Sequence, residues 1–455
     1  MWCCKVYNEL TKNPSVHHFL LWINDFYSLK IFMSLFKRLF KWSPAILTAA
    51  YILDISRHDK PLSIYDQYQF PKLMQYYISY NLSKFPPEYI KPWMYDHFLG
   101  HFLLRNTLFK VFCGGESLHD LQSTMIRLQQ LNIGTIADYS VEQDDVAIDS
   151  KEERQRQHIL GDTHGEVLKQ SCLGDFSAIK VTALGPTICL QRVTNLINDI
   201  EAKYDKLTMF SIFQQNKAKE YLSDNVDCNE QDLYDFNRMY QRVHDIIDHA
   251  AQHRTQITID AEQSYYQPAI ALISILLAKE FNNDKSVVLP TYQLYLKRGM
   301  DDLKNAIAYA NKESFLFGCK IVRGAYLNSE KKRAQELQIE SPINDSIEKT
   351  HSDFNAAIHV LKDYVDDHPT ATNIIASHNH RSMEIAQELF ENNKKSAVLG
   401  QLLGLQDTLT SRMVDNNYRA YKYVIYTHLG AIWTIRKCCS LFNQKSAREQ
   451  FCFTQ

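Results

Sequence analysis

The sequence is poor in the features that mark fibrous, linker-like and disulfide-stabilised chains. Its 455 residues include only 14 Gly and 12 Pro, too few for a collagen-like or Pro-rich chain. The 10 cysteines are scattered without a Cys-x-x-Cys pair, a spacing that fits neither a zinc site nor a small disulfide scaffold. We therefore expect a reduced intracellular protein with mostly buried thiols.

A charge excess and a long apolar run are missing as well. The 50 Lys+Arg face 52 Asp+Glu, so the net charge of −2 disfavours a dedicated nucleic-acid protein, which needs a basic excess. No stretch reaches the ~18 uninterrupted apolar residues of a membrane-spanning helix. Any membrane association is therefore expected to be peripheral. What is present is a globular composition, 45% hydrophobic and 22% charged.

Residues 1–130 have mainly helical patterns and include a basic amphipathic segment at 30–41. This segment has the charge of a mitochondrial presequence, which is basic and poor in acidic residues. It also fits a surface helix that packs its Leu and Phe side chains on the core. Glu9 and Asp25 interrupt the basic character of the region, so both interpretations stay open.

From residue 131 the pattern changes to short β-branched runs separated by helical stretches such as 270–281, 302–310 and 346–364. Eight strands are predicted, at 133–139, 178–184, 257–262, 287–293, 317–324, 373–379, 396–402 and 421–426. Eight alternating units predict an α/β fold, a (β/α)₈ barrel of the TIM type over residues 131–437, preceded by the N-terminal helical region. A doubly wound sheet is the alternative, although no Gly-x-Gly-x-x-Gly occurs.

Polar stretches interrupt the barrel pattern at three places. Residues 143–170 and 217–232 read as insertions, and residues 330–343 resemble a mobile loop. A tail follows at 438–455.

Polar side chains also occur within or at the ends of the apolar strand runs. They are Lys180, Asp260, Gln293, Lys320, Arg323, His378 and Gln401. A buried unpaired charge costs several kcal/mol, so each charged member must be paired or contact a ligand. A single case is ordinarily a satisfied ion pair or an exposed strand end. Their recurrence in most strands predicts a polar ligand across the C-terminal mouth of the barrel.

The pair His378-Asn-His380 has a competing interpretation, because two histidines at a barrel strand end can bind a metal. A metal-dependent hydrolase would need further His or carboxylate ligands at matching strand ends. Asp260 could serve, but the other strands offer Lys and Gln. We therefore expect no metal here.

Two segments, Ile259-Asp-Ala-Glu-Gln-Ser-Tyr-Tyr-Gln-Pro-Ala269 and Lys320-Ile-Val-Arg-Gly-Ala-Tyr326, are similar to motifs of the proline dehydrogenase (proline oxidase) family, in its eukaryotic mitochondrial branch. Further matches follow in family order at 115–116, 137–142, 178–184, 291–297, 376–379, 400–405 and 421–424. The resemblance implies a barrel that holds FAD and oxidises L-proline to Δ¹-pyrroline-5-carboxylate, the first step of proline catabolism. It further implies a quinone electron acceptor and a place on the matrix side of the mitochondrial inner membrane.

The resemblance also carries residue roles. It implies that the substrate pocket is lined by Lys180, Asp260, Tyr326 and Tyr423. It implies cofactor contacts from Gln293, Lys320, Arg323, Gly324, Ser377, His378 and Gln401. The related hydroxyproline dehydrogenases tend to carry a small hydroxyl residue where this chain has Tyr423. The bulkier ring favours proline as the substrate, with hydroxyproline as the alternative.

After Tyr423 the resemblance ends abruptly. The family continues with a Pro-Tyr-Gly turn and a helix whose paired arginines grip the substrate carboxylate. This chain lacks both, and its nearest substitute is Arg436-Lys437. Either this pair forms a divergent clamp, in which Arg436 binds the carboxylate bidentately, or the segment does not perform the family's role, as in an alternatively spliced form. The second alternative predicts a catalytically impaired or inactive member that acts as an interaction partner.

Overall fold

The computed structural model describes residues 109–139, 163–215, 217–224 and 228–427. All of these except 109–111 belong to one compact unit, Phe112–Thr434. Several sequence predictions lie outside the described residues. They are the segment 30–41 and most of the N-terminal helical region, most of the 143–170 insertion, the pair Arg436-Lys437 and the tail 438–455.

Within this part of the chain, nine parallel strands form one sheet, in the order β1-β9-β2-β3-β4-β5-β6-β7-β8. The strands are β1 (Cys113–Gly115), β2 (Gly134–Tyr139), β3 (Phe176–Ile179), β4 (Gln256–Ile259), β5 (Val288–Gln293), β6 (Cys319–Val322), β7 (Asn373–Ala376), β8 (Ala397–Leu402) and β9 (Arg419–Tyr426). Because β9 pairs with both β8 and β2, the strands β2 to β9 close into a ring. The predicted (β/α)₈ barrel is confirmed, and the open-sheet alternative is excluded.

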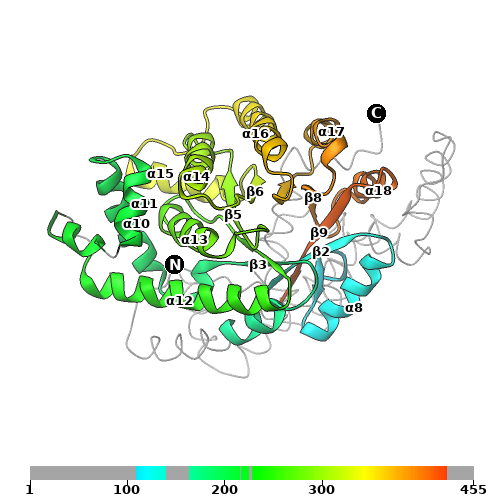
Figure 1. The fold of residues 1–455 in the computed structure, drawn as a ribbon, viewed down its shortest axis with the longest axis horizontal. Coiled ribbons are helices and arrows are strands. Elements are labelled where there is room, and N and C mark those ends of the chain that lie inside the picture. The colour runs from blue at the N-terminus through cyan, green and yellow to red at the C-terminus, as the bar shows by residue number, and fades with distance from the viewer. Residues whose placement is uncertain (1–108, 140–162, 216, 225–227, 428–455) are drawn as a thin grey trace, which may run out of the picture. The chain divides into compact units, whose positions relative to one another are not determined.

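The ring closes where its first strand in the sequence, β2, pairs with its last, β9. The register between β2 and β9 runs from Gly134↔Tyr421 to Tyr139↔Tyr426. Figure 1 shows it as the orange-red β9 beside the cyan β2. The carboxyl ends of all the strands therefore meet at one mouth, where the polar side chains of the sequence were expected to gather.

Helices connect the strands and pack around the ring. They are α7 (Lys110–Phe112), α8 (Leu118–Gln129), α10 (Thr187–Glu201), α11 (Lys206–Gln214), α12 (Glu230–Gln252), α13 (Gln267–Phe281), α14 (Gly299–Glu313), α15 (Leu327–Leu337), α16 (Ile347–Asp367), α17 (His380–Leu389) and α18 (Asp407–Asp415). Short 3₁₀ segments are η3 (Val181–Leu184), η4 (Ala218–Asp224) and η5 (Glu391–Asn393). Residues 163–170 are helical as well.

Local sequence accounts for where these helices begin. Ser117 caps α8 and Asn229 caps α12, each in a capping box with an Asp three residues on. Pro268 lies in the first turn of α13, where its missing N–H costs nothing. The long apolar run of α13 is buried between the barrel and its neighbours, as the 270–281 pattern predicted.

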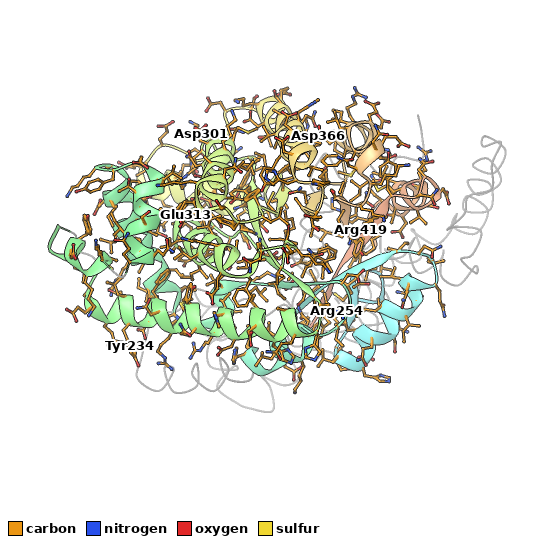
Figure 2. All side chains as sticks on the ribbon, viewed as in Figure 1. Tyr234, Arg254, Asp301, Glu313, Asp366 and Arg419 are labelled. Carbon is orange, nitrogen blue, oxygen red and sulfur yellow. The ribbon has the colours of Figure 1, made fainter. Side chains whose placement is uncertain are left out.

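The strand side chains alternate between two cores. Outward residues such as Ile257 and Ile259 join the large core between sheet and helices. Inward residues form a smaller core inside the ring, with contributions from six strands, β2, β3, β5, β7, β8 and β9. This alternation places Thr258 and Lys320 inside the barrel, while Lys422 points toward the helices. Outside the helical layer, Figure 2 shows the exposed Asp301, Asp366 and Tyr234.

Every predicted strand overlaps a strand of the ring, but two local predictions are wrong. Residues 178–184 do not continue as a strand, because the chain turns into η3 after Lys180. Ala183 N donates to Lys180 O at 3.2 Å, and Thr182 N donates to the Glu262 carboxylate at 3.1 Å. The predicted loop 330–343 is helical in its first half, as part of α15. β1 was not predicted, because three residues are too short for a period to register.

In the described part of the chain, we find no helix with both the length and the apolarity needed to cross a bilayer.

Candidate functional site

A cluster of four charged side chains and one tyrosine lies at the mouth of the barrel, and we call it the charge cluster: Asp138, Lys180, Asp260, Lys320 and Tyr423. Lys180 Nζ is 2.6 Å from Asp138 Oδ2 and 3.8 Å from Asp260 Oδ2. Lys320 Nζ donates to Asp260 Oδ1, and the Tyr423 hydroxyl donates to Asp260 Oδ2 at 2.6 Å. The five side chains come from, or directly follow, β2, β3, β4, β6 and β9.

The cluster is buried and balanced in charge. Asp138 is 0% exposed, Lys320 4% and Lys180 8%. The charges of its two lysines and two aspartates sum to zero, and this pairing offsets the cost of burying them. Lys180 and Lys320 also lie 6.0 and 5.2 Å from the Tyr423 ring centroid, within cation–π range. The ring thus packs between the two ammonium groups and the Asp260 carboxylate.

The electrostatics of the cluster keep Asp260 charged and Tyr423 neutral. Burial disfavours the Asp260 carboxylate, but Lys320 and Lys180 outweigh it and hold its pKa below the ordinary value. Burial raises the pKa of Tyr423 well above its usual range, and the nearby carboxylates Asp138 and Asp260 add to this. At neutral pH the tyrosine is therefore a hydrogen-bond donor and the aspartate an acceptor.

Asp138 was not singled out from the sequence. It stands at the end of an apolar run, where an acidic residue reads as an exposed strand end. Its Oδ2 accepts from Lys180, but its buried Oδ1 has no hydrogen-bond partner among the described residues. A buried carboxylate oxygen without a donor is costly, so this atom is an unused acceptor within the cluster.

Gln293 belongs to a neighbouring hydrogen-bond chain instead of the cluster itself. Its Nε2 donates to Glu262 O at 2.7 Å. The Glu262 carboxylate in turn accepts from the Thr182 N–H and hydroxyl. Asp260 and Glu262 thus take separate partners, since β4 ends at Ile259, before both of them. Through Glu262, this series of hydrogen bonds links the turn after Lys180 to Gln293 at the end of β5.

Arg323 lies on a different side of the mouth, after β6, in a group that we call the arginine rim: Arg323, Ser377 and His378. Its guanidinium donates to Ser377 Oγ, to Ser382 Oγ at 2.8 Å and to His351 Nδ1 at 3.1 Å. It also stacks 4.3 Å from the Phe354 ring centroid. No carboxylate in the described ranges pairs with it, and burial lowers its pKa to about 10.

His378 and Gln401 face the layer between the strands and α17–α18. His378 Nε2 accepts the backbone N–H of Leu402 at 3.1 Å. Gln401 Oε1 accepts from the Thr410 hydroxyl on α18, and its Nε2 donates to Ser377 O at 3.5 Å. Gln401 thus contacts the arginine rim, to which His378 belongs, and no hydrogen bond among the described residues joins either of them to the charge cluster.

Gly324 and Tyr326 follow Arg323 in the loop after β6. Gly324 has φ +148°, and a Cβ there would lie 2.3 Å from Tyr295 Cδ1, so no other residue fits without displacing that ring. Tyr326 is 8% exposed. Its carbonyl accepts from Glu330 N, and Glu330 binds Ser264 N at 2.6 Å. These contacts hold the loop beside the mouth. It directly follows β6, the strand that carries Lys320.

The two histidines of the metal alternative have different partners. His378 Nε2 is occupied by the Leu402 N–H, and His380 Nε2 lies 3.1 Å from Gln406 Oε1. Asp260, the third ligand considered from the sequence, is bound to Lys320 and Tyr423. Across the described ranges, no group of three or more His, Cys, Asp or Glu is arranged to hold a metal.

Comparisons with known proteins agree with this architecture. The sequence profile of the family described as proline dehydrogenase matches residues 121–433. The chain is 30% identical over 342 residues to proline dehydrogenase 1, mitochondrial, of Dictyostelium discoideum, covering 71% of this chain and 59% of that protein. It is 32% identical over 202 residues to the human protein of the same name, covering 43% of this chain and 34% of that protein.

Among solved structures, proline utilization A (PutA) from Bdellovibrio bacteriovorus, inactivated by N-propargylglycine, has a TM-score of 0.61 at 16% identity. The likeness covers 84% of this chain and 38% of that one. At this identity the comparison supports the fold alone. The chain spans less than two thirds of the curated relatives given above. The closed parallel barrel, the polar mouth and the profile match over most of its length together show that the chain belongs to the proline dehydrogenase family.

Proposed function

We propose that the protein catalyses the FAD-dependent oxidation of L-proline to Δ¹-pyrroline-5-carboxylate. The observation that carries the proposal is the balanced charge cluster at the mouth of a family barrel, beside an arginine with no counter-charge. The first suits a small zwitterion, and the second suits an anion. A ligand set with both properties is proline together with a flavin dinucleotide.

The residues present fit FAD on the side of the arginine rim. Arg323 is a partly buried cation whose described partners are all neutral, so no counter-charge balances it until an anion binds. A diphosphate supplies that charge, and a guanidinium binds phosphate oxygens through paired N–H donors. We propose that Arg323, Gly324, Ser377, His378 and Gln401 contact the cofactor on this side, with Gln293 and Lys320 on the side of the cluster.

Bound FAD supplies the acceptor for the two electrons that leave proline as a hydride. The residues of the chain bind and orient the substrate. Asp138 and Asp260 supply the negative charge that attracts the substrate ammonium group. Asp260 remains ionised and holds Lys320 and Tyr423 in place instead of exchanging a proton. The ammonium protons leave to solvent as the C=N bond forms, and the buried walls of the mouth exclude water from the reacting carbon.

The substrate carboxylate needs a cation, and both lysines of the cluster are already paired with aspartates. Lys180 is bound to Asp138, and Lys320 is bound to Asp260. We propose that Arg436 and Lys437, which lie beyond the described residues, grip the carboxylate. Failure of that clamp gives the second candidate function, a flavin-binding family member without turnover that acts as an interaction partner.

The names of the relatives support a compartment, whereas the electron acceptor is implied by the family resemblance alone. Several are named mitochondrial proline dehydrogenases, which supports a mitochondrial location. We propose the matrix side of the inner membrane, with peripheral attachment and a quinone as acceptor. A tryptic-accessibility assay on intact and swollen mitochondria tests the location, and reduction of a soluble quinone tests the acceptor.

The deciding experiment is anaerobic addition of L-proline to the purified full-length protein. Bleaching of the flavin band supports the proposal. A flavin-loaded protein that stays oxidised supports the second candidate, and a protein without flavin contradicts both. 4-Hydroxyproline at the same concentration separates the two substrates, and we expect slower bleaching because the Tyr423 ring occupies the mouth. D-Proline serves as the stereochemical control.

A further inference from the structure

Lys422 is a fully buried lysine that the charge cluster does not use. It is 1% exposed and points away from the mouth, between β9 and α18. Its Nζ lies 2.8 Å from Asp407 Oδ1 and 2.5 Å from Leu405 O. Asp407 is itself 7% exposed. Figure 1 shows β8, β9 and α18 together at the orange-to-red end of the ribbon.

The contacts of Lys422 hold a turn that is unfavourable in itself. Between β8 and α18, Gly404 has φ +78° and Gln406 has φ +53°. Left-handed backbone disfavours a side chain such as that of Gln406, so external contacts must stabilise the turn. Lys422 provides them, because it bonds to the carbonyl of Leu405 between these two residues and to the side chain of Asp407 directly after them.

The strand that leads into this turn also carries a hydrogen bond to His378. Leu402 is the last residue of β8, and its N–H donates to His378 Nε2 at 3.1 Å. A backbone N–H can only donate, so Nε2 is the acceptor nitrogen and the proton of the neutral ring lies on Nδ1. No described residue accepts from Nδ1. Burial, followed by the charges of Lys422 and Arg323, lowers the pKa of His378 to about 3, which keeps the ring neutral.

We propose that Lys422, paired with Asp407, is a positioning residue for the cofactor site: it holds the β8–α18 turn so that Leu402 orients His378 and leaves its Nδ1–H as a fixed donor toward the cofactor. The identity of the cofactor rests on the function proposed above. The positioning of His378 does not, because it follows from contacts within the chain.

The test uses the full chain with Lys422→Met, Asp407→Asn and the double variant. Lys422→Met removes the ion-pair partner of the buried Asp407 carboxylate, so it destabilises the fold for reasons unrelated to positioning. The double variant removes both charges and is the informative one. Lys279→Met is the matched control, because Lys279 pairs with Glu313 at 2.6 Å between α13 and α14, away from the arginine rim.

Two measurements are made on each variant. Hydrogen exchange by mass spectrometry of the flavin-free protein follows the amides of residues 399–406. Titration with FAD, followed by flavin fluorescence and by the shape of the visible absorption band, gives the dissociation constant and reports the ring environment. We expect the double variant to unfold near the wild-type midpoint, to exchange faster at 399–406, and to bind FAD on the order of 10- to 100-fold more weakly. Lys279→Met should change neither reading.

Wild-type exchange at 399–406 or a wild-type FAD dissociation constant in the double variant would overturn the positioning role. Wild-type protein that binds no FAD would refute the proposed function, and the exchange result alone would then decide the role of Lys422. If Lys422→Met does not fold, Asp407→Asn and the double variant carry the comparison, with Asp407→Glu as the rescue. Recovery of tight FAD binding in Asp407→Glu supports the proposal, since it restores the pair.

Discussion

The charge cluster and the arginine rim lie at the same mouth but solve the problem of buried charge in opposite ways. In the cluster, each lysine bonds to a carboxylate, and the group is neutral without a ligand. In the rim, Arg323 is surrounded by Ser377, Ser382 and His351, none of which carries a counter-charge. The cluster is therefore balanced by its own pairs, whereas the rim holds a cation with no counter-charge among the described residues.

The largest expected effect comes from breaking the cluster at its centre. Asp260→Asn removes the charge that both Lys320 and Tyr423 contact, and leaves a buried lysine uncompensated. We expect a loss of about 3–5 kcal/mol in the free energy of unfolding. Flavin reduction by L-proline should also slow by at least about 100-fold. Thermal unfolding and stopped-flow reduction measure the two.

The surface variant Asp366→Asn, which alters an exposed pair with Lys362, is the control and should shift stability by no more than about 0.5 kcal/mol. A fully active Asp260→Asn protein would show that the cluster is not the substrate site.

A mutation in the rim should have the opposite effect on the stability of the flavin-free protein. Arg323→Met removes a partly buried cation that lacks a counter-charge, so the flavin-free protein should be as stable as wild type or more so. FAD binding should weaken by roughly 2–5 kcal/mol, because the diphosphate loses its partner. Saturating FAD should therefore raise the melting temperature of wild type far more than that of the variant. Equal stabilisation of both by FAD would remove Arg323 from the cofactor site.

Acid should separate the two regions without any mutation. The pKa of His378 in the rim falls from 6.5 to about 3 on folding, so the unfolded chain binds its proton first as the pH is lowered. Stability is lost between these values, by about 2 kcal/mol at pH 5. Asp260 has a folded pKa below 3.8, so its contribution persists above that value and is lost only in stronger acid.

Chemical denaturation of wild type and His378→Gln between pH 7 and pH 5 measures this difference. The variant should show a flatter profile over that range, while Asp260→Asn should keep the wild-type slope. A profile for His378→Gln as steep as that of wild type would contradict the assignment.

The smallest expected change sharpens the role of the ring in the cluster. Tyr423→Phe keeps the aromatic packing but removes the donor to Asp260 Oδ2, a hydrogen bond to a charged acceptor. Such bonds contribute about 1.5–3 kcal/mol, so we expect flavin reduction by proline to slow by roughly 10- to 100-fold. Tyr423→Ser should instead open the mouth and narrow the preference for proline over 4-hydroxyproline. Rates for both substrates with both variants distinguish the hydroxyl from the ring.

The barrel could be read from the sequence because its strands are β-branched runs bounded by helical patterns. The end of the second strand could not, because Val181 and Leu184 look like strand residues and become 3₁₀ only through contacts with Glu262. Helix α15 was missed because its sequence is largely polar.

The site residues likewise fall into those that the sequence revealed and those that it did not. Lys180, Asp260 and Lys320 were visible as charges in apolar runs, and the structure brings them together. Asp138 and Lys422 were just as buried, yet one ended its run and the other stood between tyrosines, so each read as a strand residue facing solvent. Only the pairing of strands far apart in sequence shows which charge meets which. Residues 180 and 423, for example, are 243 positions apart.

Because β9 closes the ring, the barrel can be completed only after this last strand has been synthesised. During synthesis β2 to β8 leave the ribosome before β9, and until it arrives the sheet has two unpaired edges, at β2 and β8. Such edges are templates for pairing with other chains. The same strand brings Tyr423 to one face and Lys422 to the other, so the complete charge cluster and the Lys422–Asp407 pair form together, in a single late event. A nascent chain that stalls before residue 419 carries most of the barrel strands and neither of these two groups.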